Sequence, residues 1–375
     1  MIEIKEVTSR CMMRKFCNFP LKLYKGNPYY IPCFFDDEMA LFGKKNVFSD
    51  FCDSRFFLAY KDGKLAGRIA LIINHADNQK MNQLAARFSR LDMIDDIEVT
   101  RALFARAEQV AREEYGMTKM HGPLGYIDID KEGMLTKGFE YSACYGGVYN
   151  FDYYNRHMEQ LGYVKEIDWL ERLITVPKEP DERLHKMAEM IKQRYHLRDA
   201  VTNESNVKEV VKQFGAPVFE LINKAYGKLH GVVPIPPRVA ECYIKQMTLI
   251  LQSELISLIV DENDKLIALG VVFPQMGPAV NKCKGKIIPF GVLPLIKAMK
   301  HYDKVELALV AVDPAWQSKA VISLVMDRIM RNLIAKGVKY ADTDGTLENN
   351  YEINNLWERF EHVKHKRRRC YVKEI

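Results

Sequence analysis

Apolar and polar residues alternate along this chain in a way that predicts short strands interleaved with amphipathic helices. Residues 57–65 consist of an apolar stretch, the turn Asp62-Gly63 and a second stretch, and Asp-Gly in such a place is a strong hairpin signal. Residues 258–266 show the same order of strand, polar turn and strand. Apolar residues with 3.6-residue spacing lead up to Gly116 and to Gly337, which predicts two helices that end at a glycine. The predicted fold class is therefore α/β with a mixed sheet.

The order of these elements repeats after about 200 residues. Four segments match in one order, at offsets between 199 and 221 residues. They are residues 22–32 with 224–234, residues 57–65 with 258–266, the helices before Gly116 and Gly337, and residues 154–161 with 353–360. We therefore expect a duplicated chain of two tandem domains, and two unrelated α/β domains are the alternative.

The expected boundary between the domains lies at residues 176–180. Pro177 and Pro180 interrupt strand pairing there, and Asp181 can cap the helix that follows. The predicted domains are therefore residues 1–176 and residues 177–375.

The halves differ most in a stretch rich in glycine and tyrosine. Gly116 to Leu161 spans 45 residues, whereas Gly337 to Phe360 spans 23. The additional residues belong to the stretch 122–147. A loop of this length is either a lid over a cleft or a plain surface excursion.

Composition and charge narrow the function classes. The chain has 375 residues, of which 48% are hydrophobic and 28% charged, so it can bury a full core. The net charge of +6 comes largely from Lys364 to Arg369, which is too local for the broad positive face of a DNA-binding domain. There is no long apolar run and no hydrophobic signal core at the start, so we expect a cytoplasmic protein without a membrane partner. Eight scattered cysteines suit reduced thiols and predict no metal site.

The segment from Val312 to Ile322, with the sequence VDPAWQSKAVI, resembles the signature of the GCN5-related N-acetyltransferase (GNAT) superfamily. That signature is a strand ending in V-x-P, then Q/R-x-x-G-x-G/A, then a long helix. A later family pattern, an Asn with an aromatic residue seven positions on, is matched by Asn350 and Trp357. The order of elements in both halves also resembles bacterial proteins that carry two acyl-CoA N-acyltransferase-like domains in tandem.

The resemblance implies that the second domain binds acetyl-CoA or another acyl-CoA. The start of a helix offers unpaired backbone N–H groups and a positive dipole end to a diphosphate. Ala320 and Ile322 stand where the signature has small residues, and a polar turn that only caps the helix is the alternative. The residues implied to hold the cofactor are Val310, Val312, Gln317, Ser318, Lys319, Ala320, Val321 and Asn350.

The corresponding helix start in the first domain departs further from the signature. Residues 90–98 contain no glycine and four acidic residues. Carboxylates at a helix start satisfy the same N–H donors that would otherwise hold phosphate. We therefore expect the first domain to be a scaffold, or a wall of the acceptor cleft, with a degenerate cofactor loop.

Acyl transfer to an amine needs a base and often an acid for the departing thiolate. The resemblance implies Glu306 as the base, because some members of the superfamily have a glutamate at the start of this strand. Trp357 and Met158 stand where the family commonly has its tyrosine acid, and neither side chain delivers a proton at neutral pH. Tyr351, on the same segment as Trp357, is the nearest candidate for that role.

Further acids follow the next predicted strand: Asp342, Asp344 and Glu348. They would favour a cationic amine acceptor, although a solvated strand end is the alternative. The run from Lys364 to Arg369 is expected to form a final strand whose long side chains are mostly solvated, or else to contact phosphate.

The leading hypothesis is an N-acyltransferase that moves an acetyl or larger acyl group from acyl-CoA to a small-molecule or peptide amine. One alternative is a non-catalytic protein of the same fold that binds a ligand or a partner. Another is a nucleic-acid-binding regulator, based on the basic run at the end of the chain. A homodimer is compatible with each of these hypotheses.

Overall fold

The computed structural model describes residues 1–144, 147–229, 231–287 and 291–375. Below, the first half means residues 1–176 and the second half residues 177–375. The strands of the first half are β1 (Ile2–Glu6), β2 (Cys52–Lys61), β3 (Lys64–Asn74), β4 (Ala85–Met93), β5 (Lys119–Gly122), β6 (Met134–Lys137) and β7 (Val164–Thr175). The strands of the second half are β8 (Arg198–Asp199), β9 (Ile256–Val260), β10 (Leu266–Pro274), β11 (Lys304–Val312), β12 (Tyr340–Thr343), β13 (Thr346–Leu347) and β14 (His362–Glu374).

Helices follow the strands in the order that the repeat predicts. The helices of the first half are α1 (Arg10–Leu23), α2 (Phe35–Ala40), α3 (His75–Met81), α4 (Ile97–Tyr115) and α5 (Tyr153–Gln160). Those of the second half are α6 (Glu182–Arg194), α7 (Val207–Tyr226), α8 (Pro237–Met247), α9 (Gly277–Lys282), α10 (Val292–Lys300), α11 (Ile322–Ala335) and α12 (Tyr351–Trp357), with short 3₁₀ turns at η1 (Ser253–Leu255) and η2 (Pro314–Lys319).

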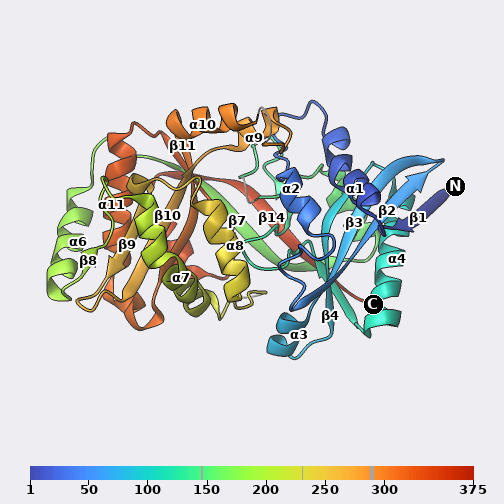
Figure 1. Ribbon diagram of the computed structural model, residues 1–375, viewed down its shortest axis with the longest axis horizontal. Coiled ribbons are helices and arrows are strands. Elements are labelled where there is room, and N and C mark those ends of the chain that lie inside the picture. The colour runs from blue at the N-terminus through green and yellow to red at the C-terminus, as the bar shows by residue number, and fades with distance from the viewer. Residues whose placement is uncertain (145–146, 230, 288–290) are drawn as a thin grey trace.

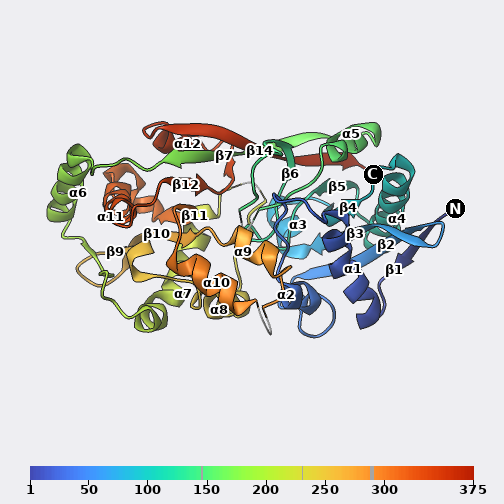
Figure 2. The same cartoon turned by 90° about the horizontal axis from the view of Figure 1, so that it is seen from above.

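The strands of the described residues belong to one mixed sheet, whose main path runs in the order β1-β2-β3-β4-β5-β14-β7-β12-β11-β10-β9-β8. Off this path, β6 pairs with β14 and β13 pairs with β7. The two halves exchange their last strands. β7 of the first half pairs with β12, while β14 of the second half pairs with β5, and β7 and β14 pair with each other along most of their length. Both strands therefore bridge the molecule from one half to the other (Figure 1, Figure 2).

Each half of the sheet is covered by helices on both faces. Phe57 and Leu58 are neighbours on β2, so they point to opposite faces, and they belong to different cores. Phe57 packs in the core that contains α4 residues, and Leu58 packs in the core that contains α1 residues. The core around Leu58 also contains residues of α7 and α8, so the two halves share one apolar core on that side.

The local sequence predictions are confirmed. The predicted hairpin turn at Asp62-Gly63 joins β2 to β3. Helix α4 ends at Gly116 in a left-handed conformation (φ 66°), as the glycine stop predicts. Asp181 caps α6 by accepting hydrogen bonds from the Arg183 and Leu184 amides.

The expectation that the terminal basic run is mostly solvated is wrong for two of its members. Lys366 and Arg368 are both 4% exposed, because β14 lies in the middle of the sheet and not at an edge. Each forms an ion pair of 2.6 Å with Glu171 on β7. Burial alone would raise the pKa of Glu171, but the two cations hold it below its ordinary value. The remaining basic residues of the run are also paired with acids, Lys364 with Glu358 and both Arg367 and Arg369 with Asp168. This pairing leaves little of the run for contact with phosphate.

Replacing Glu171 with glutamine should destabilise the protein strongly, because Lys366 and Arg368 would lose the carboxylate that compensates their burial. We expect the free energy of unfolding in urea to fall by about 3 kcal/mol. The control is Asp264→Asn, which removes an exposed ion pair with Arg198 and should cost at most about 0.5 kcal/mol. Equal effects of the two substitutions would contradict this account of β14.

Candidate active site

The strands β11 and β12 separate in the second half of the molecule. They pair in parallel from Lys304 and Tyr340 as far as Leu307 and Thr343, where β12 ends. β11 continues to Val312 without a partner on that side. A bulge in the pairing of β10 with β11 falls at the same level, between Val271 and Val272. The part of β11 beyond Leu307 therefore has no strand partner on the side of β12, and the strand direction changes locally at the bulge.

The helix that follows β11 begins beside this opening. After the turn η2, Ala320 adopts a left-handed conformation (φ 55°), and α11 starts at Ile322. Within the part of the chain that the structure describes, the backbone N–H groups of Ala320, Val321 and Ile322 donate no hydrogen bond. No side chain caps this helix start. These amides and the positive end of the helix dipole form a site that suits an anion such as a diphosphate.

The matching place in the first half is closed by its own side chains. Asp96 caps α4 by accepting a hydrogen bond from the Glu98 amide, as the acidic sequence predicts, and it also pairs with Lys61. The hydroxyl of Tyr154 accepts a hydrogen bond from the Met93 amide at the end of β4. Asp92, which forms a buried ion pair with Arg68, lies beside the Tyr154 hydroxyl. Asp96 therefore occupies the start of α4, which is the place in the first half that matches the start of α11.

A large cavity opens from the separated strands toward the first half. Its volume is about 1860 Å³, well above the roughly 300–1,000 Å³ of common small-molecule sites. The walls come from both halves, and most of their surface is apolar. Apolar lining residues include Leu41, Phe48, Tyr243, Met247, Phe273 and Met299. The cavity can therefore hold a ligand with a long hydrocarbon part.

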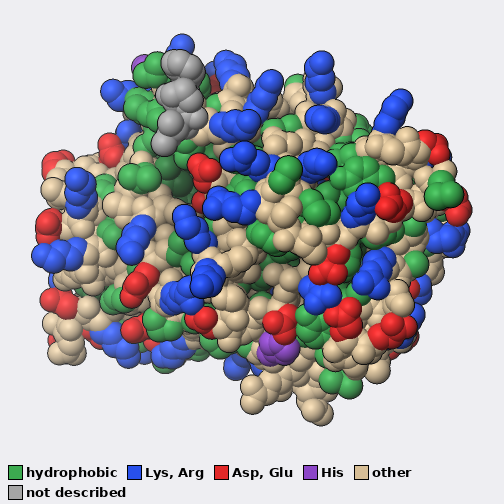
Figure 3. Space-filling view, turned by 45° about the vertical axis from the view of Figure 1, so that its right-hand side comes forward, with side chains coloured by type: hydrophobic (Ala, Val, Ile, Leu, Met, Phe, Trp, Pro, Cys, Tyr) green, Lys and Arg blue, Asp and Glu red, His purple; other side chains and the backbone are tan. Residues whose placement is uncertain are grey.

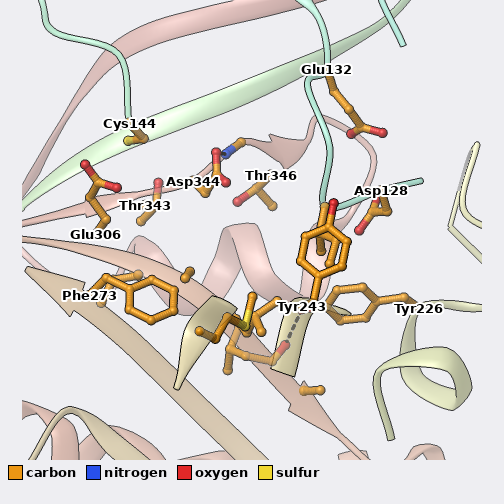
Figure 4. Close-up of a pocket in the computed structure, with 18 of the residues that line it drawn as sticks. Asp128, Glu132, Cys144, Tyr226, Tyr243, Phe273, Glu306, Thr343, Asp344 and Thr346 are labelled. Carbon is orange, nitrogen blue, oxygen red and sulfur yellow. Dashed lines mark hydrogen bonds between the residues drawn. The ribbon is translucent and has the colours of Figure 1, made fainter. Parts of the chain in front are cut away.

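Carboxylates enter the cavity from the first half's additional stretch. Asp128 and Glu132 lie on the segment after β5 and line the cavity beside Tyr226 and Tyr243 (Figure 4). Among the described residues, neither carboxylate makes a hydrogen bond or an ion pair. The stretch 122–147 therefore forms part of the cavity wall, which agrees with the lid interpretation; Tyr145 and Gly146 fall outside the described residues.

Burial changes the acidity of both groups. It raises the pKa of Asp128 to about 6, and the charge of Asp344 adds to the effect. Burial likewise raises the pKa of Glu132 well above its ordinary value, with a further contribution from Asp128. A carboxylate that titrates close to neutral pH in a cavity is a candidate for proton transfer.

Further polar groups face the cavity from the second half. Glu306, Thr343, Asp344 and Thr346 lie across the opening from Asp128 (Figure 4). Asp344 accepts a hydrogen bond of 2.8 Å from Arg368, which connects the cavity to the buried ions of β14. The Tyr226 hydroxyl donates to the Val310 carbonyl at 2.8 Å, on the unpaired part of β11.

Most of the residues predicted from the sequence meet at this cavity. Those that line it are Glu306, Val310, Val312, Gln317, Ser318, Ala320 and Asn350. Val321 is buried at the helix start, and the Lys319 ammonium lies 3.9 Å from the centre of the Trp316 ring, so both stand beside the lining. Tyr351 is 72% exposed and does not line the cavity, whereas Trp357 does. The structure therefore separates the predicted acid from the predicted base.

Sequence reasoning missed Asp128 and Glu132. They belong to no motif, and their stretch was noted only for its glycines and its length. The signal that could have found them was the three acids at alternate positions, Asp128, Asp130 and Glu132, inside an insertion that interrupts an otherwise regular repeat.

Comparisons with known proteins agree with this architecture. No family model matches the sequence. The chain is 26% identical to Protein YghO of Escherichia coli strain K12, over 97% of this chain and 93% of that protein. It is 23% identical to the bacterial ceramide synthase of Caulobacter vibrioides, over 100% of this chain and 98% of the synthase. Among solved structures, a tandem GNAT protein from the clavulanic acid biosynthesis pathway matches 100% of this chain and 98% of its own, with a TM-score of 0.55 at 11% identity. The chain therefore has the tandem GNAT-type fold.

Asp128→Asn should stabilise the folded protein at alkaline pH. The pKa of Asp128 is about 6 in the folded state and close to its ordinary value, about 4, when unfolded. Stability therefore falls as the pH rises from about 4 to 6, and the loss persists above pH 6. We expect the variant to melt about 2 °C above the wild type at pH 8, and the difference to vanish below pH 4. A lower melting temperature at pH 8 would show that the ionised carboxylate is stabilised by its surroundings.

Proposed function

We propose that this chain, which has the tandem GNAT-type fold, is an acyl-CoA-dependent N-acyltransferase whose acceptor is a long-chain amine. The observation that carries the proposal is the uncapped start of α11 beside separated strands, opening into a large apolar cavity that contains carboxylates. The amides of Ala320, Val321 and Ile322 would hold the diphosphate of CoA. Bound acyl-CoA would supply the thioester that the amine attacks.

The acceptor class follows from the cavity walls and from one relative. An amine is a cation at neutral pH, and the acids that line the cavity attract a cation. The apolar walls suit a hydrocarbon chain of the acceptor, of the acyl group or of both. A ceramide is the amide of a fatty acid with a long-chain amine, and one relative over the whole length is named a ceramide synthase. That name supports a product of the same chemical kind.

The chain's own groups would handle the proton. Asp128 has a pKa of about 6 and is mainly ionised at pH 7, so it can accept the proton that the ammonium must lose before attack. Glu132 lies next to it and would share this task. Glu306 lies across the cavity and remains a candidate for the same role. The apolar walls exclude bulk water, which protects the thioester from hydrolysis.

A non-catalytic protein of this fold is the second candidate function. The observation that favours it is Trp357, which lines the cavity at the place where the superfamily commonly has a tyrosine acid. Such a protein would bind acyl-CoA but would not release free CoA thiol from it when an amine is added. The two tests below separate the candidates.

The first test concerns binding of CoA. A carboxylate placed beside the helix start should repel the diphosphate, which is also what we expect of the acidic helix start in the first half. We expect Ser318→Asp to weaken CoA binding by about tenfold or more in calorimetric titration. The matched control, Ser318→Ala, removes the hydroxyl without adding charge and should stay within about twofold of the wild type. If the wild type and Ser318→Asp bind CoA with equal affinity, the diphosphate does not bind at the start of α11.

The second test concerns the base. With hexadecanoyl-CoA and octadecylamine, Asp128→Asn should lower kcat/KM at pH 7.5 by about 100-fold, measured as release of free CoA thiol. In the wild type kcat/KM should fall below about pH 6, as Asp128 becomes protonated. The control is Asp37→Asn, which removes another cavity-lining carboxylate that also has a pKa of about 6 but lies on α2. A similar loss in both variants would assign the effect to general cavity charge, and no loss in Asp128→Asn would exclude Asp128 as the base.

A further inference from the structure

An exposed apolar face lies beside the cavity. It consists of helix α10 and Leu249, and we refer to it as the α10 face. Leu293 is 72% exposed and Leu249 is 77% exposed, and both Val292 and Ile296 are exposed as well. No residue of α10 is buried. Large apolar side chains that gather on the surface in this way mark a site of interaction.

Lysines lie on α10 and on the segment that precedes it in the sequence. From Gln275 to Tyr302 the sequence contains five lysines and no aspartate or glutamate. The lysines are Lys282, Lys284, Lys286, Lys297 and Lys300, and all five are exposed. None of them forms an ion pair within the described residues. Figure 3 shows Lys and Arg side chains along the whole upper edge of the molecule, and α10 occupies one part of this edge in Figure 1.

Helix α10 carries apolar and basic side chains next to each other, as helices that bind at a membrane surface do. Leu293 and Ile296 are three residues apart and therefore neighbours on one side of α10, and Lys297 and Lys300 lie next to them. An apolar strip flanked by lysines binds at the boundary between lipid headgroups and acyl chains, where the apolar side chains enter and the ammonium groups meet anionic headgroups.

The same helix forms part of the cavity wall. Val292, Leu295, Ile296 and Met299 line the cavity, as does Leu249. Gln252, close to Leu249, donates a hydrogen bond of 2.8 Å to the Met299 carbonyl, which holds this loop against α10. The apolar surface therefore continues from the outside of the molecule into the cavity.

A second copy of this chain is a poorer occupant of the α10 face than a bilayer. A twofold dimer through this face would bring the lysines of two copies together. An anionic surface complements the same charges. Within the described residues, no helix of this chain has both the length and the apolar character that crossing a membrane requires.

We propose that the α10 face docks the protein on the surface of an anionic phospholipid bilayer, with the cavity opening toward the lipid. The docking does not depend on the chemistry performed in the cavity. Its use to the protein rests on the proposed function, because a long-chain amine resides in the bilayer and would enter the cavity along α10. The contact is peripheral, and it departs from the sequence-based expectation of a protein without a membrane partner.

The test is sedimentation of the purified full-length protein with vesicles. We expect the wild type to bind vesicles of phosphatidylcholine with 30% phosphatidylglycerol at 0.1 M NaCl. Binding should fall at least tenfold in 0.5 M NaCl or with phosphatidylcholine alone, because screening and loss of anionic lipid remove the lysine contribution. Lys297→Glu with Lys300→Glu, and separately Leu293→Asp, should each weaken binding by about tenfold or more.

Matched controls lie on other helices. Met190→Asp on α6 changes an exposed apolar residue, and Lys208→Glu on α7 reverses an exposed charge, and both variants should bind vesicles like the wild type. Because the readout is binding without substrate, loss of acyltransferase activity and loss of docking are measured separately. The proposal is overturned if the wild type does not bind anionic vesicles, or if the α10 variants bind as well as the controls. A dimer in solution that Leu293→Asp dissociates, without vesicle binding, would assign the face to a second copy.

Discussion

The structure depends on one constraint: a strand rich in lysine and arginine occupies the middle of a continuous sheet. Since β14 has β5 on one side and β7 on the other, its cations cannot all reach water. The Glu171 carboxylate compensates the charges of Lys366 and Arg368. The Asp342 Oδ2 atom lies 3.7 Å from the Nζ atom of Lys366. Removing the Glu171 carboxylate would leave the charges of Lys366 and Arg368 buried without a partner. The exchange of β7 and β14 connects each half to the other. The two halves of this chain thus share one sheet and one apolar core, and residues of both halves line the cavity.

The two copies of the repeat carry different parts of the site. The second copy keeps an uncapped helix start and separated strands, which suit an anionic cofactor. In the first copy Asp96 occupies the helix start, and Tyr154 and Asp92 fill the space beside it. Its additional stretch instead brings Asp128 and Glu132 to the cavity. Arg368 joins these parts, because it donates to the Glu132 carbonyl and to the Asp344 carboxylate. A change in β14 would therefore disturb both the fold and the position of the acids.

Local features of the fold were predictable from the sequence because their causes are local. The hairpin at Asp62-Gly63, the glycine after α4 and the cap at Asp181 each rest on a few neighbouring residues. The exchange of strands was not predictable, because pairing between Ile174 and His362 leaves no mark in either segment. The burial of Lys366 was not predictable either, because it results from this long-range pairing and not from the neighbouring residues in the sequence. At the site, Ser318 and Ala320 followed from a motif, whereas Asp128 became a candidate only once the fold placed it in an apolar cavity.

The proposed long-chain acceptor and the proposed docking of the α10 face raise one physical problem, which is how a long hydrocarbon chain would reach the cavity. A chain that moves from a bilayer into an apolar cavity exchanges one hydrocarbon environment for another, so the hydrophobic effect, worth about 0.8 kcal/mol per CH₂ against water, gives little net gain. Recognition would then come from the polar end of the molecule, and the carboxylates that line the cavity would supply it. A route through water would cost that free energy for every CH₂. In the proposed docked state, a path along α10, where exposed leucine and isoleucine side chains lie beside the cavity, would avoid that cost.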